Sequence, residues 1–321
     1  MIHFIPKKEY RELPPSHGLS VISDDDFTNR EGPRGHVINI AREYVCVFNF
    51  EDGFFDDNNT ALIIAAAAAG SGISMPEGEE GFAAMRASQD GLLRIDEEAL
   101  RRIDTIESVR FNTLQNNQSV LKGQVVAGVK IISRTAGDDR LPRIEKLCHE
   151  CRPLIDVLPF KQFRVGIVAI DTDIPTDRMN AAINPILQEK FTALGSPVLR
   201  QECVSGDITA GAAAIRRLID SGADLVVCAG GMNRGPDDQL AAAVRAAGGK
   251  ITSDDHSPAL SRMMVFRGWI GPVPVLRFPD CVMHHRSSVF DLVMPRYLAG
   301  VAITEEDFAN YGRDGLCLSS S

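Results

Sequence analysis

The sequence lacks a long apolar run and a basic block, and each absence excludes a class of function. The longest apolar candidate, residues 61–69, is rich in alanine and falls well short of the ~18–20 residues of a membrane-spanning helix. Lys and Arg total 34 against 43 Asp and Glu, which gives a formal net charge of -9. An acidic chain is a poor partner for nucleic acid or an acidic membrane. We therefore expect neither partner.

Cysteines are few, and a secretion signal is also missing. The seven Cys are scattered and odd in number, and Cys46, Cys203 and Cys228 lie in apolar stretches. This pattern is typical of buried free thiols in a reducing compartment. Residues 1–13 have neither the apolar core nor the cleavage site of a signal peptide. The sequence therefore predicts a cytoplasmic protein.

The length of 321 residues suggests two domains, because a domain typically has ~100–200 residues. We predict an N-terminal α+β domain over residues 1–155 that begins with a polar arm at 1–35. The pattern then changes to a regular alternation of strands and helices, which predicts an α/β domain over residues 156–300. A C-terminal tail follows at 301–321.

The N-terminal half shows weak and irregular patterns. Asp96 precedes an acidic first turn and predicts the N-cap of a helix over residues 97–103. Lys122-Gly123 predicts a turn between two strands. The remaining expected elements are strands at 36–40, 44–50, 109–114 and 124–132, a helix at 60–69, a loop at 70–81, a hinge at 135–140 and a short helix at 141–150.

The second half alternates regularly between strands and helices. Apolar runs predict strands, and apolar residues spaced by three or four positions predict helices. The expected strands are 165–170, 198–204, 224–229 and 273–278, and the expected helices are 180–194, 210–219, 238–247 and 283–298. Continuous apolar strands that alternate with amphipathic helices indicate a mostly parallel sheet covered on both faces. The fold class is therefore α/β, in three α/β/α layers.

In such a sheet, ligands bind beyond the carboxyl ends of the strands. The stretch ADLVVCAGGMNRGPDD places Gly230-Gly231 at the end of one strand, where a ligand can approach the backbone closely. Asp237 and Asp238 then open a helix, whose free amides favour an anion. These carboxylates could hold Mg²⁺ with a substrate phosphate. Alternatively, the glycines form a simple turn and the aspartates cap the helix.

This stretch resembles the strand–GG–x₅–DD segment of the molybdopterin-binding domain, which molybdenum insertases, molybdopterin adenylyltransferases, gephyrin and the competence/damage-inducible proteins share. RVGIVAIDTDI, ECVSGDITAGAAAIRRLIDSGADLVV and VPVLRFPDCVMHHRSSVFDLVMPRYLAG are similar to other parts of the same domain. GLLRIDEEAL and LKGQVVAGVKII resemble the N-terminal domain of the stand-alone bacterial molybdopterin-binding proteins. The resemblance covers residues 90–321 well.

The resemblance implies the molybdopterin-binding fold, a small-molecule pterin ligand (molybdopterin or the molybdenum cofactor), Mg²⁺ and a homo-oligomer. It implies that Asp237 and Asp238 are the catalytic and metal-binding residues. The implied cofactor-binding residues are Asp171, Thr172, Asp173, Asp207, Gly230, Gly231, Met232, Asn233, Pro279 and Asp280. Two of these, Asp171 and Asp280, stand where the family usually has a loop glycine.

Three functions remain open. The first is a transferase of molybdenum cofactor biosynthesis, acting in adenylyl transfer or metal insertion. The second is a non-catalytic protein that stores, delivers or senses the cofactor. The third is a degenerate member that binds another phosphorylated ligand or a protein partner. We rank binding of a molybdopterin-type ligand first and leave catalysis open.

Other motifs are weaker. No strand is followed by G-x-G-x-x-G, so a Rossmann dinucleotide site is not favoured. Cys148 and Cys151 could begin a zinc site, but a second ligand pair is missing at a usable spacing. His284-His285 lies near the last ligand loop and could contact phosphate, although a solvated helix start explains it as well.

Overall fold

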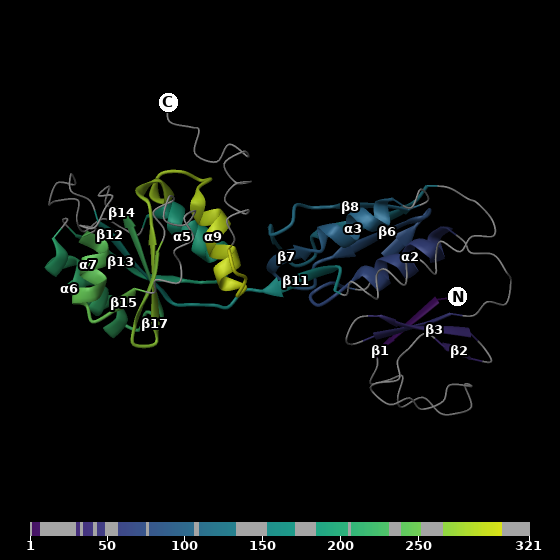
Figure 1. The fold of residues 1–321 in the computed structure, drawn as a ribbon, viewed down its shortest axis with the longest axis horizontal. Coiled ribbons are helices and arrows are strands. Elements are labelled where there is room, and N and C mark those ends of the chain that lie inside the picture. The colour runs from purple at the N-terminus through teal and green to yellow at the C-terminus, as the bar shows by residue number, and fades with distance from the viewer. Residues whose placement is uncertain are drawn as a thin grey trace. The chain divides into compact units, whose positions relative to one another are not determined.

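In the structure, a computed structural model, the chain forms two compact units, residues 1–159 and 160–321. Each unit is described by itself, and both are drawn in Figure 1. The described residues are 2–6, 30–32, 35–40, 44–48, 57–74, 77–105, 109–132, 153–170, 184–204, 207–230, 239–251 and 266–303. The expected hinge at 135–140, the expected helix at 141–150 and the Cys148–Cys151 pair lie outside these ranges.

Unit 1 begins with an antiparallel sheet of four strands in the order β1-β4-β3-β2. The strands are β1 (Ile2–Pro6), β2 (Arg30–Gly32), β3 (Gly35–Ile40) and β4 (Tyr44–Phe48). The expected strands at 36–40 and 44–50 are confirmed. The prediction of a polar arm over 1–35 is wrong for β1 and β2, because tertiary pairing overrides the weak local pattern of these segments.

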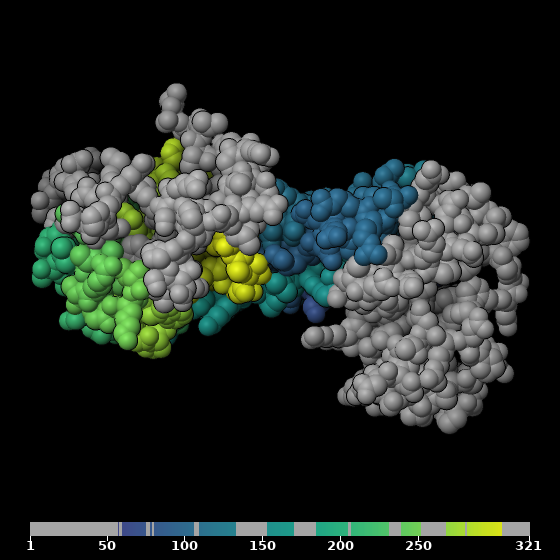
Figure 2. Space-filling model, viewed as in Figure 1, coloured from purple at the N-terminus to yellow at the C-terminus, as the bar shows by residue number. Residues whose placement is uncertain are grey.

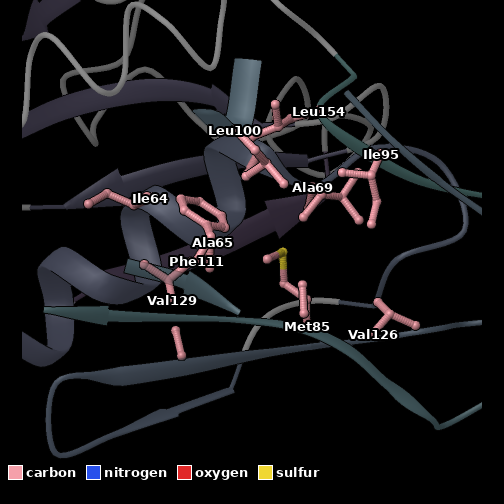
Figure 3. Close-up of a cluster of buried hydrophobic side chains, with 14 of the residues drawn as sticks. Ile64, Ala65, Ala69, Met85, Ile95, Leu100, Phe111, Val126, Val129 and Leu154 are labelled. Carbon is pink, nitrogen blue, oxygen red and sulfur yellow. The ribbon is translucent and has the colours of Figure 1, made fainter. Parts of the chain in front are cut away.

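Helix α2 (Asp57–Ala68) packs against a second four-stranded sheet, ordered β5-β6-β10-β8. This sheet contains β5 (Glu77–Glu79), β6 (Phe82–Arg86), β8 (Val109–Thr113) and β10 (Val125–Ile131). The expected loop at 70–81 therefore contains a strand. Figure 3 shows part of the shared core, with Ile64 and Ala65 of α2 beside Phe111 of β8.

A three-stranded sheet completes unit 1 in the order β11-β7-β9, with β7 (Gly91–Ile95), β9 (Ser119–Val120) and β11 (Ile155–Pro159). Helix α3 (Glu97–Asp104) follows β7, and the Asp96 carboxylate accepts a hydrogen bond from the Ala99 amide at 2.9 Å. The predicted helix and its cap are confirmed. The three strands were not predicted.

Unit 2 contains a six-stranded sheet in the order β13-β12-β14-β17-β16-β15. The first four strands are parallel, and β16 and β15 add to one edge in antiparallel orientation. The strands are β12 (Val165–Ile170), β13 (Val198–Val204), β14 (Leu225–Gly230), β15 (Lys250–Ile251), β16 (Phe266–Ile270) and β17 (Val273–Phe278). The α/β class with a mostly parallel sheet is confirmed.

Helices cover both faces of this sheet, as Figure 1 shows. Helices α5 (Pro185–Ala193) and α9 (Val289–Leu298) share one apolar cluster, which includes Phe191, Phe278 and Phe290. Helices α6 (Ile208–Asp220) and α7 (Gln239–Ala246) share the other. In Figure 2, green atoms of residues in the α7 region and yellow atoms of α9 form parts of the visible surface. No described helix is long and apolar enough to span a membrane.

The expected single helix over 283–298 is wrong at its start. A short 3-10 helix, η5 (Asp280–Met283), follows β17, and α9 begins only after Ser288. Ser288 forms a capping box with Asp291, in which the Asp291 carboxylate accepts the Ser288 amide at 2.8 Å. Such a reciprocal cap satisfies helix amides that would otherwise lack partners, and it fixes the start of α9.

Candidate ligand site at the carboxyl edge of the sheet

The carboxyl ends of four parallel strands meet at one edge of the sheet in unit 2, which we call the carboxyl edge. Ile170 at the end of β12 is paired with Val204 of β13 on one side and with Gly230 of β14 on the other. In the next pair of strands, Ala229 is paired with Phe278 of β17. The loops after β12, β14 and β17 therefore start side by side, and the predicted convergence is confirmed.

Two backbone features shape this edge. Gly230 is buried and has a φ of 104°, a conformation that is strained for any residue with a Cβ atom. Pro279 is buried and extended, with φ -64° and ψ 159°, and it leads directly into η5. Helix η5 contacts β14. At Gly230 the edge therefore presents backbone without a side chain, which suits close approach of a ligand.

A buried cation lies beside this edge. Arg277 is 5% exposed and stands one residue before the end of β17, paired with Cys228 of β14. A guanidinium is charged at every physiological pH and can bind phosphate with two hydrogen bonds. Arg277 therefore adds positive charge close to the strand ends where an anionic ligand would lie.

Asp207 has a structural role that the structure shows directly. It is the N-cap of α6, and its carboxylate accepts hydrogen bonds from the amides of Thr209 at 3.3 Å and Ala210 at 3.1 Å. Its side chain is exposed after the end of β13. Asp207 therefore lies at the carboxyl edge, as predicted, while its carboxylate stabilises a helix.

An ion pair holds α6 against β13, further from the carboxyl edge. The Arg217 guanidinium donates to both carboxylate oxygens of Glu202, with Nε 3.0 Å from one of them. The hydrogen bond to Glu202 is the main cause that raises the pKa of Arg217 above its ordinary value. Glu202 is 9% exposed, so this pair fixes α6 on the sheet while Arg217 stays charged.

Asn184 connects three elements around the edge. As the N-cap of α5, its Oδ1 accepts from the Leu187 amide at 3.1 Å. Its Nδ2 donates to the Met283 carbonyl of η5 at 3.0 Å, and its own amide donates to Gln201 Oε1 of β13 at 2.8 Å. Asn184 was not among the predicted site residues, although an Asn followed by Pro is a typical start of a helix.

The segment after η5 is also tied to α5. Lys190 Nζ donates to Ser288 Oγ at 3.1 Å and to Asp291 at 2.7 Å, and it lies 5.2 Å from the centre of the Phe290 ring. A second, exposed pair joins Arg286 and Glu189 at 3.4 Å. Helix α5 and its N-cap thus contact the middle and the end of the segment between β17 and α9.

The predicted histidines and thiols lie near the edge without forming a metal site in the described part of the chain. His284 is exposed at the end of η5, and His285 is partly exposed. Cys203 and Cys281 are partly buried and Cys228 is buried, and the three sulfur atoms are not joined in disulfides. Among the described residues, no group of three His, Cys, Asp or Glu side chains could hold a metal ion.

Of the predicted site residues, the structure brings four to the carboxyl edge. Gly230 and Pro279 line it, Asp280 opens η5, and Asp207 caps α6. Eight lie outside the described residues, namely Asp171, Thr172, Asp173, Gly231, Met232, Asn233, Asp237 and Asp238. Their roles stay predictions. Helix α7 begins at Gln239, directly after Asp238 in the sequence.

The comparison with protein families identifies the domain that carries this edge. Residues 166–296 match the model of the family described as "Probable molybdopterin binding domain". This segment includes β12, β14, β17 and their helices, so unit 2 contains a molybdopterin-binding domain related to molybdenum cofactor biosynthesis proteins. No curated protein sequence matches the chain.

Several solved structures are similar to this chain. The tungsten cofactor synthesizing protein MoaB from Pyrococcus furiosus is 19% identical, with 39% of this chain and 87% of that chain covered and a TM-score of 0.30. The molybdopterin biosynthesis enzyme MoaB from Thermus thermophilus is 20% identical, with 43% and 97% covered and a TM-score of 0.28. CinA from Thermoplasma acidophilum is 18% identical, with 38% and 89% covered and a TM-score of 0.29.

Proposed function

We propose that this protein binds molybdopterin or the molybdenum cofactor at the carboxyl edge of unit 2 and acts in molybdenum cofactor biosynthesis in the cytoplasm. The family match over residues 166–296 carries the proposal. The convergence of β12, β14 and β17 at one edge supports it. In an open α/β sheet, this edge is where ligands bind.

The described residues suit a phosphorylated pterin. The backbone at Gly230 allows close approach, and the buried charge of Arg277 favours a phosphate group. We propose that the loop from Gly231 to Asn233 contacts the ligand and that Asp237 and Asp238 hold Mg²⁺. Two carboxylates match the oxygen ligands that Mg²⁺ prefers. When bound, the ion would neutralise charge on the phosphate.

Two activities fit such a site. As a transferase, the protein would catalyse adenylyl transfer or metal insertion, with Asp237 and Asp238 as the catalytic carboxylates. Catalysis of this kind depends on charges held in fixed positions.

As the resemblance implies for such domains, we also expect a homo-oligomer. Gel filtration coupled to light scattering would measure its molar mass.

A second candidate is a non-catalytic protein that senses or delivers the cofactor, and the aspartates at 171 and 280 favour it. A carboxylate ~5 Å from a phosphate charge opposes binding by roughly 3 kcal/mol at an effective dielectric constant of ~20. A helix N-terminus stabilises an anion by only about 0.3–1 kcal/mol at an exposed site. One aspartate that faces the ligand would therefore outweigh the helix unless a cation lies nearby.

The experiment that tests ligand class is mass spectrometry of gently purified protein, combined with a molybdopterin titration in the presence and absence of Mg²⁺. We expect a retained pterin and Mg²⁺-dependent binding. The double substitution Asp237→Asn, Asp238→Asn should abolish the Mg²⁺-dependent binding with little change in Tm. The matched control is Asp220→Asn, Asp224→Asn, which removes two carboxylates next to the opposite end of β14 and should leave binding unchanged.

The same titration separates the two candidates. In the non-catalytic case, Asp171→Gly, Asp280→Gly should bind molybdopterin more tightly than the wild type does when Mg²⁺ is absent. Tight binding by the wild type without Mg²⁺, with no gain in the variant, would show that these aspartates point away from the ligand. A wild type with no affinity for molybdopterin and no retained pterin would refute the proposed ligand class.

A further inference from the structure

We propose that Asn184 is a positioning residue for the ligand site, because its side chain holds the η5 turn at the carboxyl edge. This inference rests on the proposed function for its ligand and on the described hydrogen bonds for its geometry. Asn184 is the N-cap of α5, 99 positions from Met283, and it joins the helix after β12 to the turn after β17.

The side chain of Asn184 uses its two polar atoms for different tasks. Oδ1 accepts from the Leu187 amide and caps α5. Nδ2 donates to the Met283 carbonyl and anchors η5. An aspartate would serve the first task equally well, because Asp and Asn are similar N-cap residues. The second task needs a donor, so the amide group of asparagine is the part that matters for the turn.

The η5 turn has weak internal support. Its first residue follows Pro279, which has no amide proton and gives no side-chain cap. Two of its backbone bonds are long, since the Val282 amide lies 3.3 Å from the Pro279 carbonyl and the His284 amide lies 3.2 Å from the Cys281 carbonyl, while the His285 amide lies 3.0 Å from the Cys281 carbonyl. A single turn of 3-10 helix also has poorer hydrogen-bond geometry than an α-helix. Val282 and Met283 are buried in the apolar cluster of unit 2, so the turn is held by apolar packing, and the lateral bond from Asn184 adds a directional polar anchor to it.

The position of Asn184 is itself fixed. The Gln201 side chain of β13 accepts its backbone amide at 2.8 Å, and the Gln201 Nε2 lies 3.5 Å from Cys203 Sγ on the same strand. The backbone of Asn184 is thus bound to β13 of the sheet, while its side chain is bound to η5. Because Pro279 and Asp280 begin the turn whose last carbonyl is anchored, a shift of η5 would move the backbone at the carboxyl edge. Binding sites lose affinity when their supporting contacts are loosened by even ~1 Å.

The test uses the substitution Asn184→Asp in the full chain, measured by amide hydrogen exchange and by titration with molybdopterin. We expect exchange at Val282 and His284 to become about ten-fold faster, as loss of one net hydrogen bond implies. Exchange at Leu187 should stay slow because the cap of α5 is retained. The affinity for molybdopterin should fall by about ten-fold with Tm nearly unchanged.

The matched control is Asp96→Asn, which exchanges the same two groups at the N-cap of α3 in unit 1. This control should change neither the amide hydrogen exchange at Val282 and His284 nor the affinity for molybdopterin. Unchanged exchange at Val282 and His284 in Asn184→Asp would overturn the inference, whatever the ligand. Faster exchange with wild-type affinity would overturn the link to binding. If the wild type itself binds no molybdopterin, the proposed function fails, and the ligand half of this inference fails with it.

Discussion

The two units build their cores from side chains of different size. The cluster around α2 in unit 1 contains many alanines, among them Ala61, Ala65 and Ala68, and Phe111 is its aromatic member among the buried residues described. The cluster under α5 and α9 in unit 2 contains Phe163, Phe191, Phe278 and Phe290. Small side chains let a helix approach its neighbours closely, whereas aromatic rings fill the space between more distant elements.

This difference predicts opposite sensitivities to substitution. A helix packed through alanine has no room for a larger side chain, so unit 1 should be sensitive to enlargement. A core filled by rings loses volume when a ring is removed, so unit 2 should be sensitive to truncation. The chain has a single tryptophan, Trp269 in β16 of unit 2. Its fluorescence can therefore follow the unfolding of unit 2 separately.

The largest effect should come from Phe290→Ala. Phe290 is 1% exposed and its ring lies 4.9 Å from Phe191 in a T-shaped arrangement. We expect a loss of about 3–5 kcal/mol in the free energy of unfolding of unit 2, measured by urea denaturation with Trp269 fluorescence. Phe290→Leu is the control and should lose less. Equal losses for both variants would show that ring volume does not stabilise this core.

A smaller effect should come from enlargement in unit 1. Ala65→Leu places three further carbon atoms beside Phe111 and should destabilise unit 1 by about 1–3 kcal/mol. Ala65→Gly should cost only about 1 kcal/mol, mainly through helix propensity. Circular dichroism would follow both variants, and the Trp269 transition should not move. If Gly costs more than Leu, the core around α2 has spare volume, and the contrast between the units is wrong.

The polar tie between α5 and α9 should contribute less than the rings. Lys190→Met removes a largely buried ammonium that contacts Ser288 and Asp291, and we expect a loss of about 1 kcal/mol. Arg286→Met is the matched control, because its pair with Glu189 joins neighbouring parts of the same elements but is 82% and 64% exposed. The control should change stability by less than about 0.5 kcal/mol. Equal effects would mean that burial does not strengthen the Lys190 contacts.

The smallest effect on stability should come from exchanging one good cap for another. Asp207→Asn keeps one of the two oxygens that accept from Thr209 and Ala210, and because Asn and Asp are similar N-caps it should change the free energy of unfolding by only a few tenths of a kcal/mol. Asp207→Ala should lower the free energy of unfolding by about 1 kcal/mol. Asp96→Ala in unit 1 should have a similar effect, because each cap stabilises only the start of its own helix. A fall in molybdopterin affinity in Asp207→Asn at unchanged stability would assign the carboxylate a ligand role as well.

The sequence predicted unit 2 far better than unit 1 for a physical reason. Buried parallel strands are apolar on both faces, so β12, β14 and β17 could be recognised from residues such as Val165–Ile170. The missed β5 contains Glu77 and Glu79, and the missed β9 has two residues. Such strands exist because distant partners pair with them, and a local pattern does not contain that information.

The same limit applies to the candidate site. The convergence of Gly230 and Pro279 followed from the general rule for parallel sheets. The hydrogen bond between Asn184 and Met283 joins residues from different helices and could not be predicted from either local segment. Arg277 was visible only as one of several arginines in the sequence, and its burial beside the edge became clear from the pairing of β17 with β14.

The open side of β13 has a consequence for how this protein behaves while it folds. Among the described strands, β13 pairs only with β12, and unpaired strand edges are templates for aggregation. Leu199 on this strand is 43% exposed, but the charged residues Arg200 and Glu202 follow it. Charges on an edge strand discourage pairing with a second chain. Replacing the exposed Arg200 by leucine should therefore lower the solubility of newly made chains, while the folded chain keeps the Glu202–Arg217 pair and most of its stability.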